Sequence, residues 1–192
     1  MFFNYNVNSY NIEFPRHLAP KGSPLQIPHI IKIEGNLIAK ALNENTKWNT
    51  FVDVGASEGL WTINMAKYFD HVIAIEPYPK AYELLKANTS SLSNVTLYNM
   101  ALSERIYKKY KMIEGPSYNI GMTKRLNELA SLDKEMLENG SKIFYTTAVT
   151  LDSMKLNNCD MIKIDAEGEE KNVLKGAKDT IKKFSPQIIV DG

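Results

Sequence analysis

A loop rich in glycine and acidic residues is the first place in this sequence where chemistry can occur. It reads Asp-Val-Gly-Ala-Ser-Glu-Gly over residues 53–59. Gly55 and Gly59 allow a tight turn and a close backbone approach by a ligand, which a Cβ atom would obstruct. About 20 residues beyond Gly55, Glu76 ends another apolar stretch, where a carboxylate can accept hydrogen bonds from both hydroxyls of a ribose. Together the two features predict a site for a nucleoside-containing cofactor.

Two cofactor classes use such a pairing, and the charges near the loop help to distinguish them. A dinucleotide would place a dianionic pyrophosphate at the start of the following helix, where Asp53 and Glu58 add like charge. S-adenosylmethionine instead brings an ammonium and a sulfonium, which carboxylates stabilise, and one carboxylate that loop amides can hold. Ser57 also stands where a G-x-G-x-x-G loop has its central glycine. We therefore favour S-adenosylmethionine, with an NAD-dependent oxidoreductase as the alternative.

A third candidate group, Asp165, Glu167 and Glu170, follows the apolar stretch Met161–Ile164. Lys163 lies two positions before Asp165 and so points to the same side of a strand, and a nearby ammonium makes the Asp165 carboxylate a weaker base. We expect Asp165 to orient the donor methionine and the acceptor hydroxyl, and Glu167 to take the proton of that hydroxyl. Glu170 falls in the first turn of the next helix, where it is either a helix-start acid or a further catalytic group.

The same stretch bears on the class of acceptor. Methyltransferases that act on amino groups of nucleic-acid bases commonly carry an Asn- or Asp-Pro-Pro-aromatic loop here, because a flipped base must stack and have its amine held. This chain reads Asp-Ala-Glu-Gly over residues 165–168, and its net charge of +1 lacks the strong basic footprint of a general nucleic-acid binder. We therefore expect a hydroxyl on a small molecule or glycan as the acceptor, and no nucleic acid as a partner.

The segments around these residues alternate between strand and helix patterns. Strands are predicted at Phe51–Val54, His71–Ile75, Val95–Tyr98, Met161–Asp165 and Gln187–Val190, with helices at Leu60–Phe69, Lys80–Asn88 and Glu169–Lys183. This alternation predicts a doubly wound, mostly parallel α/β sheet with helical crossovers. Ligands of such sheets bind at the carboxyl ends of the strands, which is where the three candidate groups lie.

The remaining segments predict one domain over residues 1–192. The apolar content of 44% suffices for one core. Residues 1–28 are rich in Asn and Pro and predict an irregular N-terminal arm, followed by a capping helix over 29–45 and the α/β core over 50–192. Within the core, residues 103–150 break the rhythm and predict an insertion over one sheet edge, with a charged helix over Lys124–Glu138 and a β-prone stretch over Ile143–Thr147.

The composition bears on the location of the protein and on whether it binds a metal. No apolar run approaches the roughly 20 residues of a membrane-spanning helix, so no span is expected. Cys159 is the only cysteine, which excludes an internal disulfide, and a cytoplasmic location is the default. The three histidines, His17, His29 and His71, lack the spacing of metal ligands, so we expect no metal.

With these motifs in view, the sequence resembles the FkbM-type methyltransferases, a Rossmann-like branch of the S-adenosylmethionine-dependent enzymes. The resemblance covers residues from about 50 to 192, and its carriers are 51–59, 75–77, 99–103, 150–152, 160–170 and 173–177. It implies methyl transfer, usually to an oxygen of a sugar or secondary metabolite. Carried over by position, it implies that Asp53, Gly55 and Gly59 contact the methionine part, Glu76 the ribose, and Met100 and Ala101 the adenine.

The full set of residues expected to contact the donor is Asp53, Gly55, Ala56, Ser57, Gly59, Glu76, Pro77, Met100, Ala101 and Asp165. Methyltransferases of this fold normally add two strands after the fifth, and this sequence lacks them. We therefore expect the strand at Gln187–Val190 to form an edge that self-associates or is covered by another segment, such as the N-terminal arm. A non-catalytic S-adenosylmethionine-binding module is a third possibility for the function.

Overall fold

A five-stranded parallel sheet forms the centre of the computed structural model, which describes residues 2–7, 9–15, 27–115, 122–126 and 131–190. Its strand order is β11-β10-β3-β4-β5, and every neighbouring pair is parallel. The strands are β3 (Thr50–Val54), β4 (His71–Ile75), β5 (Val95–Tyr98), β10 (Met161–Ile164) and β11 (Gln187–Val190). The doubly wound α/β prediction is confirmed.

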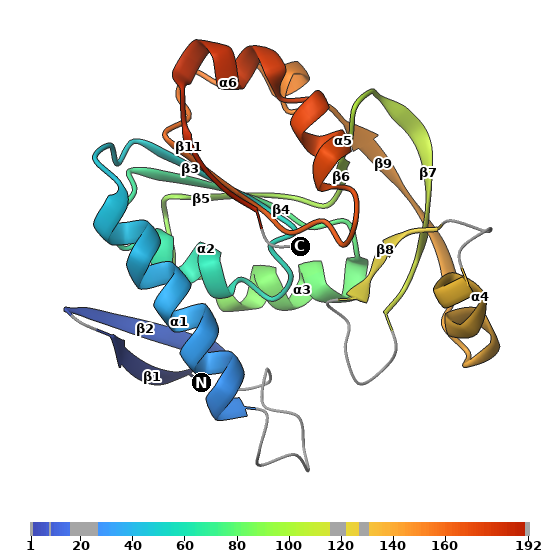
Figure 1. The fold of residues 1–192 in the computed structure, drawn as a ribbon, viewed down its shortest axis with the longest axis horizontal. Helices are drawn as coiled ribbons and strands as arrows, with labels where there is room; N and C mark the ends of the chain where they lie inside the picture. The colour runs from blue at the N-terminus through green and yellow to red at the C-terminus, as the bar shows by residue number, and fades with distance from the viewer. Residues whose placement is uncertain (1, 8, 16–26, 116–121, 127–130, 191–192) are drawn as a thin grey trace.

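Helices cover both faces of this sheet (Figure 1). The helices α1 (Ile27–Glu44), α2 (Leu60–Met65) and α3 (Pro79–Asn88) lie on one face. The other face is covered by α5 (Glu170–Lys175) and α6 (Lys178–Phe184), with the 3-10 turn η3 (Asp152–Met154) beside α6. Successive residues of β3 enter the two cores, since Phe51 packs with α1 and α2 while Val52 packs with α5. Burial on both faces explains why the strands are nearly continuous apolar runs.

The N-terminal segment differs from the prediction of an irregular arm. Residues Phe2–Val7 (β1) and Tyr10–Pro15 (β2) pair as an antiparallel hairpin. Ile12 is 1% exposed and belongs to the core that α1 and α2 form. The Asn64 side chain also accepts a hydrogen bond from the Glu13 amide at 2.8 Å and donates one to the Glu13 carbonyl at 2.9 Å. Pro15 ends β2 and Pro28 lies in the first turn of α1, while the irregular backbone predicted around Pro20 and Pro24 falls outside the described residues.

The insertion is a second sheet at one side of the molecule (Figure 1). Its order is β6-β9-β7-β8, with β6 at Ala101–Leu102, β7 at Tyr107–Ile113, β8 at Lys124–Arg125 and β9 at Ile143–Val149. The helix predicted from Lys124 begins instead at Ser131 as α4 (Ser131–Glu138). Arg125 pairs with Met112 of β7, so strand pairing overrides the local helical preference. The predicted helix over Glu169–Lys183 is likewise divided, between α5 and α6.

The edge strand β11 pairs only with β10 among the described residues. The N-terminal hairpin packs on α1 and α2 and does not pair with β11, so the described part of the arm does not extend this edge, and residues 16–26 lie outside the described residues. Self-association through this edge stays a prediction. None of the described helices combines the length and the apolar composition needed to cross a bilayer.

If the hairpin belongs to the core, truncating its buried anchor will destabilise the whole fold. Ile12→Ala should lower the free energy of unfolding by about 2–5 kcal/mol, because it removes buried apolar contacts and leaves a cavity. Asn11→Ala, at an exposed neighbouring position of β2, is the control and should change it by less than about 0.5 kcal/mol. Chemical denaturation measures both. Equal effects of the two variants would show that the hairpin is not part of the cooperative core.

Candidate functional site

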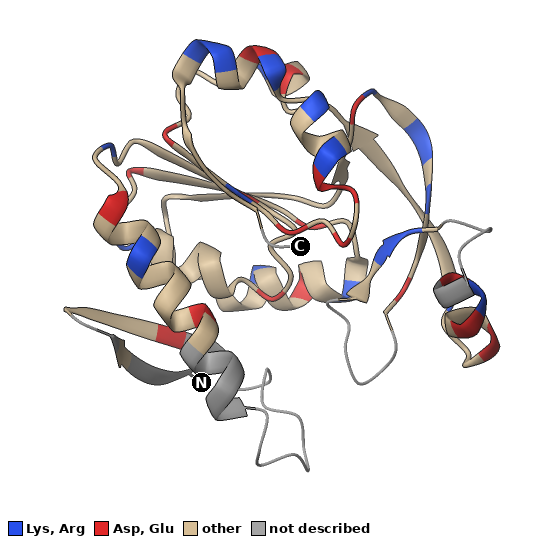
Figure 2. Ribbon diagram, viewed as in Figure 1, with Lys and Arg blue, Asp and Glu red and all other residues tan. Residues whose placement is uncertain are grey.

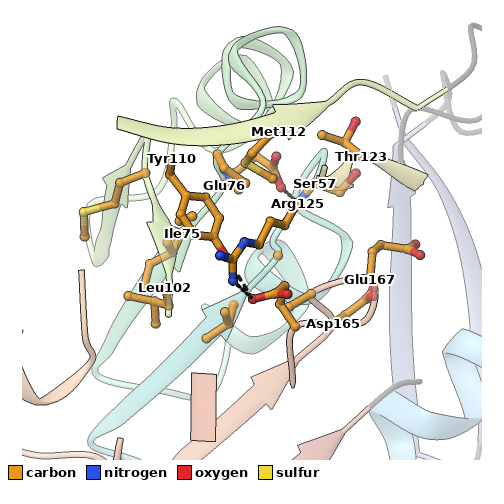
Figure 3. Close-up of a pocket in the computed structure, with 17 residues that line it drawn as sticks. Ser57, Ile75, Glu76, Leu102, Tyr110, Met112, Thr123, Arg125, Asp165 and Glu167 are labelled. Atoms are coloured by element: carbon orange, nitrogen blue, oxygen red, sulfur yellow. Dashed lines mark hydrogen bonds and ion pairs between the residues drawn. The ribbon is translucent and has the colours of Figure 1, made fainter. Parts of the chain in front are cut away.

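A single cavity gathers most of the candidate residues at the carboxyl ends of β3, β4 and β10. The insertion sheet forms its opposite wall (Figure 3). Its lining consists of Val54, Gly55, Ser57, Ile75, Glu76, Pro77, Met100, Ala101, Leu102, Tyr110, Met112, Thr123, Arg125, Asp165, Ala166, Glu167 and Glu169. Residues from three strand ends and from the insertion therefore face one space.

The loop after β3 is fixed by backbone contacts to both neighbouring strands. The amides of Gly55 and Ala56 donate hydrogen bonds to the Ile75 carbonyl at 3.0 and 3.1 Å. Gly55 has a φ of 74°, and a Cβ added there would lie 1.8 Å from the Asp165 carbonyl oxygen. From the sequence, we predicted that a glycine is needed here so that a ligand can approach the backbone closely. The structure shows that the backbone at the end of β10 already requires it.

Glu76 lies at the end of β4 with its carboxylate held by two backbone amides. One oxygen accepts from the Ser57 amide at 2.9 Å and the other from the Tyr78 amide at 2.7 Å. Burial raises the pKa of Glu76 to about 7, against the opposing effect of these two hydrogen bonds. The Asn99 side chain donates to the Glu76 carbonyl at 2.8 Å and so fixes the start of this loop. Glu76 is thus a buried acid that titrates near neutral pH.

The buried ammonium of Lys163 connects the segments at the ends of β3 and β10, which form the floor of the cavity. The Lys163 Nζ donates to the Gly55 carbonyl at 2.9 Å and lies 3.6 Å from an Asp53 oxygen and 3.4 Å from an Asp165 oxygen. Burial acts to lower the pKa of Lys163, but the carboxylates of Asp53 and Asp165 outweigh it and raise the pKa. The Thr62 hydroxyl donates to the other Asp53 oxygen at 2.6 Å. The ammonium expected beside Asp165 is therefore present.

The acidic residues that follow β10 are held in different ways. Glu170 accepts hydrogen bonds from the amides of Ala166 and Gly168 at 3.0 and 2.9 Å, and it does not line the cavity. Its carboxylate thus stabilises the turn of its own loop. Asp165 and Glu167 both line the cavity, and Glu167 is exposed, with a left-handed φ of 50°.

The wall from the insertion carries side chains that the sequence analysis missed. The Tyr110 hydroxyl donates to the Glu169 carboxylate at 2.9 Å, and an Arg125 nitrogen lies 3.4 Å from the same oxygen. Figure 3 shows the Arg125 guanidinium reaching into the cavity beside the Tyr110 ring. No sequence signal marks Arg125, because its position depends on the pairing of β8 with β7. Residues 107–111 read Tyr-Lys-Lys-Tyr-Lys and do not alternate strictly, so no pattern marks Tyr110 either.

The structure places the predicted donor-contact residues in two layers. Gly55, Ser57, Glu76, Pro77, Met100, Ala101 and Asp165 line the cavity. Asp53, Ala56 and Gly59 lie behind its wall, where Asp53 contacts Lys163 and Ala56 packs with Leu85. Among the described residues, no group of three His, Cys, Asp or Glu side chains is arranged to hold a metal ion.

Comparisons with known proteins give the family and the fold. The sequence model of the methyltransferase FkbM domain matches residues 53–191. A solved methyltransferase FkbM from Methylobacillus flagellatus KT has a TM-score of 0.50 and 20% identity, over 74% of this chain and 32% of that one. A precorrin-6y C5,15-methyltransferase from Geobacter metallireducens GS-15 has a TM-score of 0.42 and 12% identity, over 75% of this chain and 55% of that one.

A third similar structure is the precorrin 8w decarboxylase of Methanobacterium thermoautotrophicum, with a TM-score of 0.46 and 22% identity, over 82% of this chain and 61% of that one. This chain thus spans about a third of the first of these structures and less than two thirds of the other two. No curated protein matches the sequence. At 20% identity, the likeness to the Methylobacillus flagellatus KT structure establishes the fold alone.

The contact between Gly55 and the end of β10 leads to a stability test. Gly55→Ala should destabilise the protein through the strain of a left-handed φ and through collision with the Asp165 carbonyl. Gly140→Ala is a matched control, because Gly140 has a φ of 90° and nothing within 4 Å of an added Cβ. We expect Gly55→Ala to lower the free energy of unfolding by about 1–3 kcal/mol more than the control, as overpacking does. If chemical denaturation showed equal losses in the free energy of unfolding for the two variants, the loop backbone would be able to move away from the collision at no cost.

Proposed function

This chain belongs to the FkbM methyltransferase family, and from that premise we propose that it transfers a methyl group from S-adenosylmethionine to a hydroxyl of a small molecule or glycan. The observation that carries the proposal is the shared cavity at the ends of β3, β4 and β10, where Glu76 and Asp165 lie on either side of the Gly55 loop. When bound, S-adenosylmethionine supplies an electrophilic methyl group and leaves as S-adenosylhomocysteine.

The lining offers groups suited to each part of such a donor. Glu76 would accept hydrogen bonds from the ribose hydroxyls, since a carboxylate at the end of the second strand serves this purpose in nucleoside-binding sheets. Pro77, Met100 and Ala101 provide an apolar surface for the adenine. The Ser57 hydroxyl would donate to the donor carboxylate, since the amides of Gly55 and Ser57 already donate to Ile75 and Glu76, and Asp165 would hold the ammonium. Asp53, Ala56 and Gly59 act through the shape of the loop, because they lie behind the wall.

Charge supports this choice of cofactor. Asp165, Glu167 and Glu76 all face the cavity, and a sulfonium and an ammonium are favoured next to carboxylates. A dianionic pyrophosphate in the same place would meet repulsion. The electrostatics of the lining therefore favour the methyl donor over a nicotinamide dinucleotide.

The assignment of the base follows from how each acid is held. Glu170 is bound to two backbone amides, and Glu169 accepts from Tyr110, Asn172 and Arg125. These contacts occupy both carboxylates with donors of the protein itself, and Asp165 lies 3.4 Å from the Lys163 ammonium. Glu167, which lines the cavity just past the end of β10, is our candidate to accept the proton of the acceptor hydroxyl while the hydroxyl oxygen attacks the methyl carbon. Positioning of donor and acceptor supplies much of the remaining rate.

The role of Glu76 predicts a pH-dependent affinity for the donor product. Because ribose hydroxyls hydrogen-bond best to the ionised form and the pKa of Glu76 is about 7, S-adenosylhomocysteine should bind more weakly as the pH falls below 7, by up to about tenfold per pH unit. Above pH 7 the affinity should level off. Calorimetry at pH 5.5 to 8.5 measures this, with NAD as a comparison ligand that should not bind.

Two variants assign the titration. Glu76→Gln should weaken S-adenosylhomocysteine binding at pH 8 by about 1.5–3 kcal/mol, the range for hydrogen bonds to a charged group, and abolish the pH dependence. Glu58→Gln is the matched control, because burial raises the pKa of Glu58 to about 7 as well, and it should keep the slope. A slope that persists in folded Glu76→Gln would place the ribose elsewhere, and binding of NAD instead of S-adenosylhomocysteine would overturn the proposed function.

The catalytic assignment predicts different kinetic effects for neighbouring acids. Glu167→Gln should lower kcat by roughly 10²- to 10⁴-fold, the usual size of a general-base contribution, and leave S-adenosylhomocysteine affinity unchanged. Asp165→Asn should impair donor affinity and turnover together. Transfer of labelled methyl groups to a panel of sugars and glycans measures turnover. Full activity of Glu167→Gln would remove it from the base role and leave a mechanism that rests on positioning.

A further inference from the structure

The insertion places one cation in a cavity whose other charged residues are acids. Among the lining residues that the structure describes, Arg125 of β8 is the single cation, and its side chain is 37% exposed. The acids at the ends of β4 and β10 lie across from it, and Figure 2 shows the blue β8 opposite the red segment that leads into α5. The cavity therefore has an acidic side at the strand ends and a basic side at the insertion.

Aromatic rings hold the Arg125 guanidinium in place. Its central carbon lies 5.1 Å from the centre of the Tyr110 ring and 5.6 Å from that of Tyr107. Such cation–π contacts orient a planar guanidinium without using its N–H groups. The only hydrogen bond of Arg125 in the described part of the chain joins one nitrogen to Glu169 at 3.4 Å. A guanidinium has five N–H donors, so the described residues use only a small part of its hydrogen-bonding capacity.

The Glu169 carboxylate does not depend on Arg125 for its hydrogen bonds. The same Glu169 oxygen accepts shorter hydrogen bonds from the Tyr110 hydroxyl and the Asn172 side chain, both at 2.9 Å. If Arg125 turned toward a ligand, the Glu169 carboxylate would keep these two donors, and no buried charge would be left unpaired. A structural ion pair is usually bidentate and closer. The long single contact instead suits an arginine that exchanges a weak internal partner for a ligand.

We propose that Arg125 binds a carboxylate or phosphate group of the acceptor, so that the enzyme selects molecules carrying an anionic group beside the hydroxyl that is methylated. This inference rests on the proposed function, since it assigns the acceptor half of the same cavity. A planar guanidinium matches both anions, with two parallel N–H···O bonds to either. The hydroxyl then lies toward Glu167 and the anion toward the insertion, and repulsion keeps the anion away from the acids at the strand ends.

The test compares matched sugars that differ only in charge. D-glucuronate and D-glucose 6-phosphate supply the two anions, and D-glucose is their neutral counterpart. Binding of each to the protein saturated with S-adenosylhomocysteine is measured by ligand-observed NMR at constant ionic strength. We expect at least one anionic sugar to bind fivefold or more tightly than D-glucose. The better anion distinguishes a carboxylate site from a phosphate site.

Variants connect that preference to Arg125. Arg125→Gln should abolish it, and Arg125→Lys, which keeps the charge but loses the fork, should retain part of it. Lys109→Gln removes an equal charge from an exposed position of β7 over the Tyr145 ring, outside the cavity, and should leave the preference intact. Each variant is checked for unchanged thermal unfolding and S-adenosylhomocysteine affinity.

Two results would overturn the inference. One is equal binding of charged and neutral sugars by the wild-type protein, and the other is an anion preference that persists in folded Arg125→Gln. Failure of the wild-type protein to bind S-adenosylhomocysteine would count against the proposed function instead. The sugar titrations, repeated on the protein alone, would then still decide whether Arg125 binds anions.

Discussion

The ammonium of Lys163 is the interaction on which the rest of the site depends. Removing a charge of this size from water carries a penalty of several kcal/mol, so it is tolerated only with close compensating partners. Here three oxygens supply them, from Asp53 on β3, from Gly55 in the loop after β3 and from Asp165 after β10. These partners belong to segments more than 100 residues apart in sequence. One buried charge therefore fixes the relative position of the two strand ends that form the floor of the cavity.

The insertion is joined to this floor by polar contacts on two sides. On one side the Tyr78 hydroxyl donates to Glu114 at 2.8 Å, which connects the loop after β4 to the insertion sheet. On the other side Tyr110 reaches Glu169 just before α5. Both contacts pair a tyrosine hydroxyl with a carboxylate, an arrangement that tolerates an apolar ring and a polar tip in the same place. These two contacts thus hold the insertion against the segments that follow β4 and β10.

The sequence indicated most of the cavity lining at the strand ends and missed most of the lining from the insertion, for a physical reason. The residues of the 53–59 loop and Glu76 are placed by short strand-to-turn segments, whose glycines and apolar runs are visible locally. Arg125 and Tyr110 are placed by the pairing of β7 with β8 and β9, which joins residues far apart in the chain. The helix predicted from Lys124 failed for the same reason, since local charge patterning was overridden by a strand partner. The hairpin at Phe2–Pro15 was missed because the nearby prolines favour irregular backbone. The burial of Ile12 depends on contacts with α1 and α2, which are distant in the sequence.

The acids around the cavity show how one residue type can serve different purposes within a few positions. Glu170 satisfies amides of its own turn, Glu169 holds the tyrosine and arginine of the insertion, and Asp165 shares the Lys163 ammonium. In each case the donors around the carboxylate decide what it does. Glu76 is the opposite case, because burial outweighs its two amide donors and raises its pKa to about 7. Donors and burial, more than residue type, therefore separate the acids that hold the structure from those that can respond to a ligand.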